Sequence, residues 1–494
     1  MQKNLFSGSF MDMLDSKDPL IILADNFPWS KVESELSQYY TGIGRPPKPI
    51  RLMVGLLLLK QLENISDENI ILQFKRNPYY QYFCGFTQYV PTIPCHSTEL
   101  VKFRNRIGKD GFEFIFKMSV LMHGDAAEES QIVIDSTVQE SNITFPTDGK
   151  LAIKIIAKLL KIAKKEKIKL RRSYVKEIKQ LRIQLRFFRH PKKIKTAMGA
   201  MKRLRQIAMI ILKDIERKFG ECDINDLDSD TLKLHAKYAE TFYLFNRVLR
   251  QEKNTPNKIY SLHELDAYAV NKGKDHKGYE FGTKASIATT MNSGIIVGVA
   301  AHKTNIGDVN TLDEVLENVH KNRITPVEEA VCDRGYRGRK EVSNNRHSLN
   351  LVIITIIIIL IATRKELENQ ILICLLNTMQ LAYTTKISIP GTVLKRDTKK
   401  QLEEKRKKFR RRAAIEPVIG HLKSDYRMAR NYLRGFKGDE INLLLAASAF
   451  NLKKWMNIYF YALFTNNYTL IMIAKKQIRD INLSIFRLLI IKIS

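Results

Sequence analysis

The alternation of strand-like and helix-like segments constrains the fold of this chain most strongly. A β-branched run at residues 131–135 ends in a carboxylate and reads as a buried strand. Helical patterning with few breakers follows it to about residue 257. The later segments read as strands at 267–270 and 279–301 (broken by a turn at 291–294), a helix at 309–322 and a strand at 327–332. This order predicts an α/β fold whose core is interrupted by a helical insertion.

The N-terminal part is predicted to form a small all-α, helix-turn-helix-like domain. Residues 1 to about 45 are expected to be an irregular arm, and residues 47–64 an apolar helix. Two further short helices follow, the last of which carries Arg104 and Arg106. The cap candidates are Ser66 or Asp67 for a helix at 67–76, and Ser97 for a helix that Gly108 closes.

Positive charge is concentrated in two stretches of the chain. The 494 residues include 82 Lys and Arg against 51 Asp and Glu, a net charge of +31. Residues 150–220 hold 24 basic and 4 acidic residues, and residues 390–412 hold 11 and 3. One such run fits a solvated helix face or attraction to anionic lipid. Two dense clusters favour nucleic acid, because Lys and Arg neutralise phosphates and release their counterions.

Cysteine usage and hydropathy exclude several classes of protein. The five cysteines form no C-x-x-C pair, which excludes a disulfide scaffold and a Cys-rich zinc module. The N-terminus lacks the apolar segment of a signal peptide. The strongest apolar run, residues 351–362, is too short to span a membrane. We therefore expect a cytoplasmic protein without a membrane partner.

Carboxylates at the ends of predicted strands suggest chemistry. Asp135 follows Ile-Val-Ile, and Asp333 follows Ala-Val-Cys. Neighbouring strand ends can hold two such groups a few ångströms apart. Singly, an Asp after a strand is more often a turn cap than a catalyst. Together with a third acid, a pair of carboxylates can hold two Mg²⁺ ions for phosphodiester chemistry.

The third acid is expected on a helix in the stretch FRRRAAIEPVIGHLK. Phe409, Arg412, Glu416 and Lys423 fall within roughly 60° of arc at about 100° per residue, so they share one helix face. That face would present a carboxylate between two cations. This arrangement suits a metal ligand with phosphate-contacting neighbours.

Several blocks resemble the insertion-sequence DDE transposases, most closely the IS five group. In order along the chain they are DSTVQE at 135–140, NI-x-x-PTD at 142–148, SLHE at 261–264, KGK-x-HK-x-YEFG at 272–282, DRGYRG at 333–338 and RRAAIEP at 411–417. The resemblance covers about residues 1–342 and 388–453. The chain has Phe409 where the family usually has Tyr, whereas Arg412, Glu416 and Lys423 match the family's pattern.

The resemblance implies an RNase H-like core with a catalytic and metal-binding triad of Asp135, Asp333 and Glu416. It implies Mg²⁺ as the cofactor, with Mn²⁺ as a substitute. The activity would be cutting at the element's terminal inverted repeats and joining the 3′-OH ends to target DNA. Partners would be double-stranded DNA and a second copy of the chain on that DNA, without a small-molecule substrate, at the bacterial nucleoid. The candidate DNA- and phosphate-binding residues are Arg412, Lys423, Lys158, Lys161, Lys165, Arg171 and Arg172.

The expected domains follow from these assignments. They are an N-terminal end-binding domain at 1–125, a catalytic core at 126–146 plus 259–455, a basic helical insertion at 147–258 and an atypical tail at 456–494. The Ile-rich range 343–387 lies between Asp333 and Glu416, where the core needs its last strand. It reads either as a core strand plus a helix or as an alien insert, and we favour the insert. Activity of this copy is therefore open, and two rival functions are a decayed end-binding protein and an RNase H-like nuclease without strand transfer.

Smaller signals are expected to be structural. His263 and His276 lie near strands, where ordinary polar contacts are favoured over contacts with DNA or metal. The turn containing His302, Asn305 and Asp308 is read as a structural feature before the helix. Gly335 and Gly338 are expected to permit the turn after Asp333.

Overall fold

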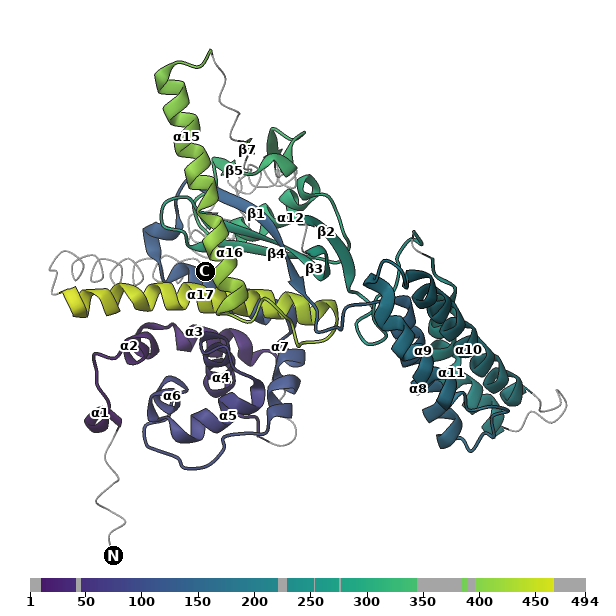
Figure 1. Cartoon of the computed structure of the whole chain (residues 1–494). Helices are drawn as coiled ribbons and strands as arrows, with labels where there is room; N and C mark the ends of the chain where they lie inside the picture. Colours follow the sequence, from purple (N-terminus) through teal and green to yellow (C-terminus); the bar gives the residue numbers. More distant parts are fainter. Residues whose placement is uncertain are drawn as a thin grey trace, which may run out of the picture. The chain divides into compact units, whose positions relative to one another are not determined.

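A computed structural model describes residues 10–40, 46–220, 229–252, 254–274, 277–343, 384–389 and 396–465 (Figure 1). The chain divides into two units. The first combines Met1–Glu140 with Thr283–Ser494, and the second is Ser141–Gly282. In the part of the chain so described, no helix is both long enough and apolar enough to cross a membrane.

The described strands form one mixed sheet. Its strands are β1 (Gln131–Glu140), β2 (Tyr268–Lys274), β3 (Lys277–Thr290), β4 (Ile296–His302), β5 (Glu329–Val331), β6 (Glu341–Ser343) and β7 (Thr384–Ser388). The order is β2-β3-β1-β5-β7-β6, with β4 paired to β3. The pairs β1/β5 and β5/β7 are parallel, while β2/β3, β3/β4 and β6/β7 are antiparallel. The expected α/β fold is confirmed, since a helical N-terminal region is followed in the chain by a mixed sheet.

The N-terminal region begins with helices where the sequence predicted an irregular arm. The helices are α1 (Phe10–Met13), α2 (Pro19–Asn26), α3 (Trp29–Ser37), α4 (Ile50–Leu62), α5 (Asp67–Arg76), α6 (Pro78–Phe83) and α7 (Ser97–Leu121). The arm prediction is wrong because Leu23, Val32 and Leu36 are fully buried in the core. Their burial orders short helices whose own propensity gives little signal.

The predicted helix boundaries are close to those observed. Ser66 caps α5 by accepting a hydrogen bond from the Asn69 N–H over 3.2 Å. The cap of α7 is His96 rather than Ser97, and its partner in a capping box is Glu99. Gly108 breaks α7 with φ +58°, a conformation that favours glycine, so the break falls where the sequence placed it.

Arg104 lies inside the N-terminal module. Its guanidinium forms two bonds to Asp67, at 3.1 and 2.5 Å, and the side chain is only 4% exposed. Lys60 approaches the same carboxylate to 2.8 Å. Arg104 therefore holds α5 against α7 and is not available to nucleic acid. Arg106, the other arginine predicted on this helix, is exposed. Its guanidinium carbon lies 4.7 Å from the centre of the Tyr40 ring.

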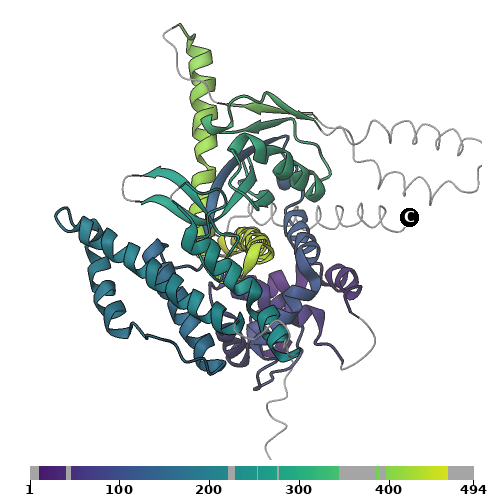
Figure 2. The ribbon, with the colours of Figure 1, turned by 90° about the vertical axis from the view of Figure 1, so that its right-hand side faces the viewer.

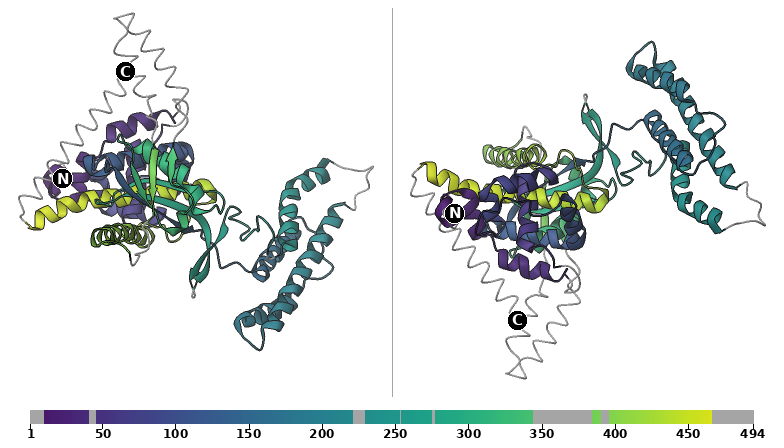
Figure 3. Two further views of the ribbon diagram at one scale, coloured as in Figure 1. Left: turned by 90° about the horizontal axis from the view of Figure 1, so that it is seen from above. Right: turned by 90° about the horizontal axis from the view of Figure 1, so that it is seen from below.

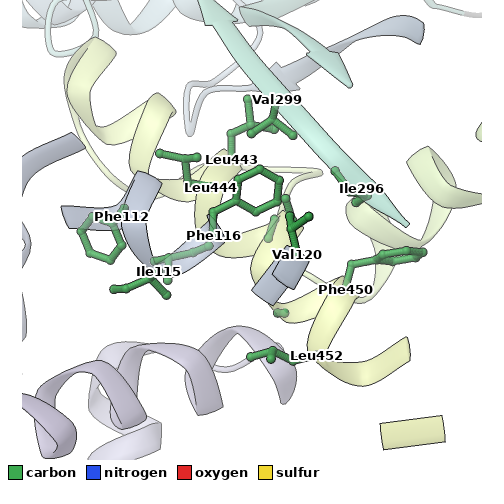
Figure 4. Packing of buried hydrophobic residues seen from close by; sticks show 14 of the residues in the cluster. Phe112, Ile115, Phe116, Val120, Ile296, Val299, Leu443, Leu444, Phe450 and Leu452 are labelled. Carbon is green, nitrogen blue, oxygen red and sulfur yellow. The ribbon is translucent and has the colours of Figure 1, made fainter. Parts of the chain in front are cut away.

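The N-terminal helices share one apolar core with the sheet. Figure 4 shows Phe116 and Val120 of α7 packing with Leu443 and Leu444 of α17 (Gly435–Thr465) and with β4. Polar contacts cross the same boundary. Nε2 of Gln61 donates to the Tyr426 carbonyl over 2.6 Å, and Nε2 of His123 lies 3.0 Å from the Asn451 carbonyl.

Shorter elements frame the strand ends of the first unit. They are α12 (Leu312–Asn322), α15 (Lys399–Ala413), α16 (Ile415–Ser424) and the short 3-10 turns η3 (Asp308–Thr311) and η4 (Arg334–Tyr336). Helix α16 packs against β1 through Ile415, Val418 and Leu422, which recur at helical spacing and are buried. This packing places Glu416 beside the sheet.

The second unit contains a helical bundle (Figure 3). Its helices are α8 (Asp148–Lys165), α9 (Val175–Gln184), α10 (Ile194–Gly220) and α11 (Ser229–Arg250), with the 3-10 turn η2 (Leu185–Arg189) after α9. Thr147 caps α8. The bundle buries Leu151, Ile155, Leu159, Ile207 and Phe245 between the helices. The expected insertion, residues 147–258, falls within this unit.

The Ile-rich range 343–387 and the C-terminal tail 456–494 were both predicted to be atypical, and parts of each belong to regular elements. The interior of the Ile-rich range, residues 344–383, lies outside the described residues. Its ends do not: Ser343 belongs to β6, and residues 384–387 belong to β7, which pairs with β5. At the C-terminus α17 continues to Thr465, so residues 456–465 extend that helix and do not begin a separate tail.

Candidate active site

Asp135 and Asp333 occupy equivalent positions on neighbouring parallel strands. The β1/β5 register pairs Val133 with Val331, and each aspartate follows two residues later along its strand direction. Side chains two residues apart point to the same face of a strand, and neighbouring strands are about 4.8 Å apart. Asp135 lies within β1, which continues to Glu140, and Asp333 comes just after β5, so the two carboxylates belong to neighbouring parallel strands.

Backbone amides orient both carboxylates. The Ser136 N–H donates to Oδ1 of Asp135 over 2.7 Å, and the Gly335 N–H donates to Oδ1 of Asp333 over 2.8 Å. The second bond caps the η4 turn, so the strand-end and turn-cap interpretations of Asp333 are both correct. Gly338 has φ +108°, which explains the second glycine of this turn.

A third carboxylate, that of Asp308, lies beside Ser136 and Gly335. Its Oδ1 accepts a hydrogen bond from Ser136 Oγ over 2.8 Å. A Cβ added to Gly335 would come within 3.0 Å both of Oδ2 of Asp308 and of Oδ1 of Asp333. These two oxygens therefore lie within about 6 Å of one another. A side chain at position 335 would therefore crowd both carboxylates.

Lys284 balances part of this negative charge. Its Nζ lies 3.1 Å from Oδ1 of Asp308 and donates to the Ile306 carbonyl over 2.7 Å. The Lys284 side chain is only 8% exposed, whereas that of Asp308 is 31% exposed. The sequence pattern predicted only a structural role for the Asp308 turn, and Lys284 was not among the predicted site residues. Asp308 comes six residues after the end of β4, so a search for acids directly after predicted strands does not point to it.

Two buried side chains, Cys332 and Tyr336, lie near the aspartates. Burial raises the pKa of the Cys332 thiol, and the charges of Asp333 and Asp135 add to the effect. Burial also raises the pKa of Tyr336, with further contributions from Cys332, Asp308 and Asp135. Both groups therefore stay neutral near pH 7. Neither is a candidate nucleophile.

Glu416 forms an ion pair with Arg412. The Arg412 guanidinium approaches Oε1 of Glu416 to 2.6 Å, and the Glu416 side chain is 60% exposed. The same guanidinium lies 5.8 Å from the centre of the Phe409 ring. These contacts bring the three side chains together, although Phe409 and Arg412 belong to α15 and Glu416 belongs to α16, where the sequence predicted one helix. Arg412 Nε is buried and has no hydrogen-bond partner among the described residues. Lys423, on the following helix α16, is half-buried.

The arrangement fits part of a magnesium site. The prediction that a strand ends at Asp135 is wrong, because β1 continues to Glu140. Asp135 within β1 and Asp333 just after β5 still supply hard oxygen ligands on neighbouring strands, which is the chemistry that Mg²⁺ prefers. Among the described residues, no three His, Cys, Asp or Glu side chains are grouped closely enough to hold a metal ion. Glu416 is turned to Arg412, so the aspartate pair is the part of the predicted triad that the structure brings together.

The basic candidates of the second unit lie on its surface. Lys158, Lys161, Lys165, Arg171 and Arg172 are all exposed. Partial burial, with a smaller effect of Lys154, lowers the pKa of Lys158. The backbone N–H of Arg171 donates to Asp214 over 3.2 Å, and the Arg172 guanidinium lies over the Tyr174 ring at 5.3 Å. Exposure is what a phosphate contact requires.

The histidines make ordinary contacts where they are described. Nδ1 of His263 lies 2.9 Å from Ser261 Oγ, and its Nε2 lies 3.3 Å from the Asn142 carbonyl. Buried His302 bridges Ser286 Oγ and Glu314, each at 2.9 Å. His276 lies outside the described residues.

Comparison with known proteins gives two family matches. The family described as "Transposase domain (DUF772)" matches residues 8–106, and the family described as "Transposase DDE domain" matches residues 214–452. The second range includes Asp333 and Glu416 but begins after Asp135, so the place of Asp135 rests on the strand register.

One curated relative is also similar. It is "Uncharacterized protein ORF8 in nfe locus" of Rhizobium meliloti, which is 34% identical over 194 residues. The alignment covers 38% of this chain and 94% of the relative. No solved structure matches the chain.

Proposed function

Because the chain belongs to the DDE transposases of insertion sequences, we propose that it cuts DNA at its element's terminal inverted repeats and joins the ends to target DNA. The observation that carries this proposal is the register that sets Asp135 beside Asp333. The sheet supports it as well. Parallel β1, β5 and β7 with antiparallel β3 and β4 on the other side of β1 fit an RNase H-like core. We place the chain in the IS five group on its motifs.

The chemistry is phosphoryl transfer in two steps. Water first attacks a phosphodiester at the element's end, which breaks the P–O3′ bond and releases a 3′-hydroxyl. That hydroxyl then attacks a target phosphodiester, forming one P–O bond and breaking another. Two Mg²⁺ ions, when bound, supply activation of the nucleophile and stabilisation of the leaving oxygen.

The chain's own residues hold and orient the reactants. Asp135 and Asp333 would bind the metal between the neighbouring strands β1 and β5, fixed by their bonds to the Ser136 and Gly335 amides. Glu416 would complete the site once it exchanges Arg412 for the metal. Arg412 and Lys423 would then position phosphates, because both lie on the helical segment that carries Glu416.

The remaining parts of the proposal concern the DNA. The exposed lysines of α8 and the neighbouring arginines would hold duplex outside the active site, in the basic helical insertion at 147–258. The N-terminal helices would read the end sequence. On the DNA the chain would act as a homodimer, and it would be found with the nucleoid.

A strand-transfer assay tests the function against its rivals. A short duplex carrying the element's end is incubated with the full chain, a plasmid and Mg²⁺ or Mn²⁺. Joined products that disappear with Asp135→Asn support the proposal. Nicks without joining would indicate a nuclease, and end binding without any cutting would indicate a decayed copy.

A further inference from the structure

Helix α15 has no buried side chain, although it belongs to the catalytic unit. None of its 15 residues is buried. A capping box between Thr398 and Gln401 begins the helix, and α16 follows after Ala414. Figures 1 and 2 both show it extending from α16 beyond the body of the sheet. A helix with this exposure is not stabilised by burial of an apolar face.

One face of α15 is already occupied by ion pairs. Lys408 lies 2.7 Å from Glu329 of β5, Lys405 lies 2.8 Å from Asp397, and Arg412 binds Glu416. At about 100° per residue these three cations fall within roughly 60° of the helix circumference. The Lys408 pair ties α15 to the sheet, and the other two pairs join α15 to the residues just before and after it.

The remaining six cations lie on the other side of the helix. They occupy an arc of roughly 140° that does not overlap the paired face. All six are exposed: Lys399, Lys400, Arg406, Lys407, Arg410 and Arg411. The pairs Arg406/Arg410 and Lys407/Arg411 are like charges four residues apart, which destabilises a helix in water. A polyanion along this face would remove that repulsion.

We propose that the exposed basic face of α15 binds the phosphate backbone of duplex DNA that enters the active site. The 15 residues span about 22 Å, and duplex DNA presents one negative charge per about 1.7 Å of its axis. Only Ala414 separates α15 from the helix that carries Glu416. The bound duplex therefore runs to the catalytic acids. This inference rests on the proposed function, and it assigns a DNA contact separate from the lysines of the second unit.

The test is a salt titration of DNA binding in EDTA, which separates binding from cleavage. The variant K399Q/K400Q/R406Q/K407Q removes four cations that are at least nine residues from Glu416. We expect the slope of log affinity against log salt to fall by about 0.9 for each phosphate that the variant no longer neutralises. At moderate salt the affinity should fall at least about tenfold.

A matched control lies on the same face. E403Q/E404Q removes two negative charges from α15, so it should leave binding equal or tighter. Because no α15 residue is buried, both variants should keep the melting temperature of the wild type. A control that weakens binding as much as the lysine and arginine variant would overturn the proposal.

Two arms identify the source of the DNA. One uses a duplex carrying the element's end, and the other adds a random-sequence duplex to protein preloaded with that end. A lower slope in either arm supports the proposal and assigns α15 to end or target DNA. An unchanged slope in both arms, while the wild type binds, overturns this inference alone. A wild type that binds neither duplex overturns the proposed function together with it.

Discussion

Ser136 donates a hydrogen bond from its Oγ to Oδ1 of Asp308 over 2.8 Å. This bond joins β1, one residue beyond Asp135, to the turn that follows β4. Lys284 of β3 binds the same oxygen at 3.1 Å. Side chains from β1 and β3 therefore meet at one carboxylate of the turn after β4, next to the strand residue that follows Asp135.

Replacing Asp308 by Ala should lower the free energy of unfolding by about 1–3 kcal/mol. The change removes the bond to Ser136 and leaves the nearly buried Lys284 ammonium without this carboxylate. The partial exposure of Asp308 keeps the effect below that of a fully buried pair. Urea unfolding measures it. Adding Lys284→Met to Asp308→Ala should cost less than the sum of the single changes, and strict additivity would contradict the pairing.

Asp135→Asn, Asp333→Asn and Glu416→Gln should each abolish Mg²⁺-dependent cleavage and leave end binding nearly intact. Each would remove a proposed metal ligand but no cation of the proposed DNA-binding surface. The defects should not add in double variants, because the three acids act as one unit. Single-turnover cleavage and fluorescence anisotropy give the two readouts. Equal loss of binding and cleavage would count against the assignment.

Replacing four lysines around the end of α8 with Gln should flatten the salt dependence of DNA binding. The positions are drawn from Lys158, Lys161, Lys164, Lys165, Lys167 and Lys169, all of which are exposed. Each phosphate that is no longer neutralised lowers the log–log slope by about 0.9. Lys237→Gln is the control, since that ammonium already pairs with Glu166 at 3.0 Å. If the slope does not change, this surface does not face DNA.

Replacing residues 344–383 by an Asn-Gly turn should give a soluble, cooperatively melting protein. Ser343 and Thr384 are the last pair of the β6/β7 ladder, and their hydroxyl oxygens lie 3.2 Å apart. A two-residue turn can therefore close the hairpin. The removed sequence includes residues 352–360, an uncharged β-prone run of the kind that promotes aggregation.

A longer deletion, residues 343–385, is the informative comparison. It also removes buried Thr385, whose Oγ1 donates to the Val327 carbonyl over 2.9 Å. This variant should melt at a lower temperature than the shorter deletion. If the shorter deletion stays in the pellet while the full chain is soluble, residues 344–383 are part of the core and not an alien insert.

His320 should make the fold sensitive to acid. Burial lowers its pKa to about 4, although its bond to the Leu316 carbonyl opposes the shift. Nε2 accepts the Val327 N–H over 3.2 Å, so the neutral ring is the one that fits. The unfolded chain therefore binds the proton first, near pH 6.5, and stability falls as the pH drops from there toward 4.

The expected loss is about 1.4 kcal/mol for each pH unit in that window. Melting temperatures of the wild type and of His320→Gln between pH 7 and 4.5 measure it. The variant should be less stable at pH 7 but should lose less stability on acidification. His123, whose burial also lowers its pKa to about 4, remains in both proteins and cancels in the comparison. Parallel curves would contradict the role of His320.

The sequence placed the start of β1 and the end of β5 well because local patterns mark them, but it ended β1 at Asp135, whereas the strand continues to Glu140. The contacts of Arg412 with Phe409 and Glu416 follow from helical spacing, although the chain forms two helices there. These local patterns needed only neighbours close in sequence, whereas the parallel pairing of β1 with β5 joins residues 198 positions apart.

The errors concern partners that are distant in sequence. Arg104 has the residue type of a DNA contact, and its burial depends on Asp67, 37 residues away. The helices before residue 45 are short, so their order comes from tertiary packing that no local period announces. The turn expected at Asp308 is present, but its contacts with Ser136 and Lys284 cross 172 and 24 residues, so the sequence did not place it near Asp135.

The apolar contact of α7 with α17 and β4 has a consequence for how such chains can diverge. Phe116, Leu443 and Val299 belong to one core, so the N-terminal helices and the sheet fold cooperatively as a single piece. Exchange of the first 125 residues with those of a relative would mismatch side chains across this surface. If the N-terminal helices read DNA ends as proposed, new end recognition should evolve by substitution on exposed helix faces, and shuffling of whole modules should be rare.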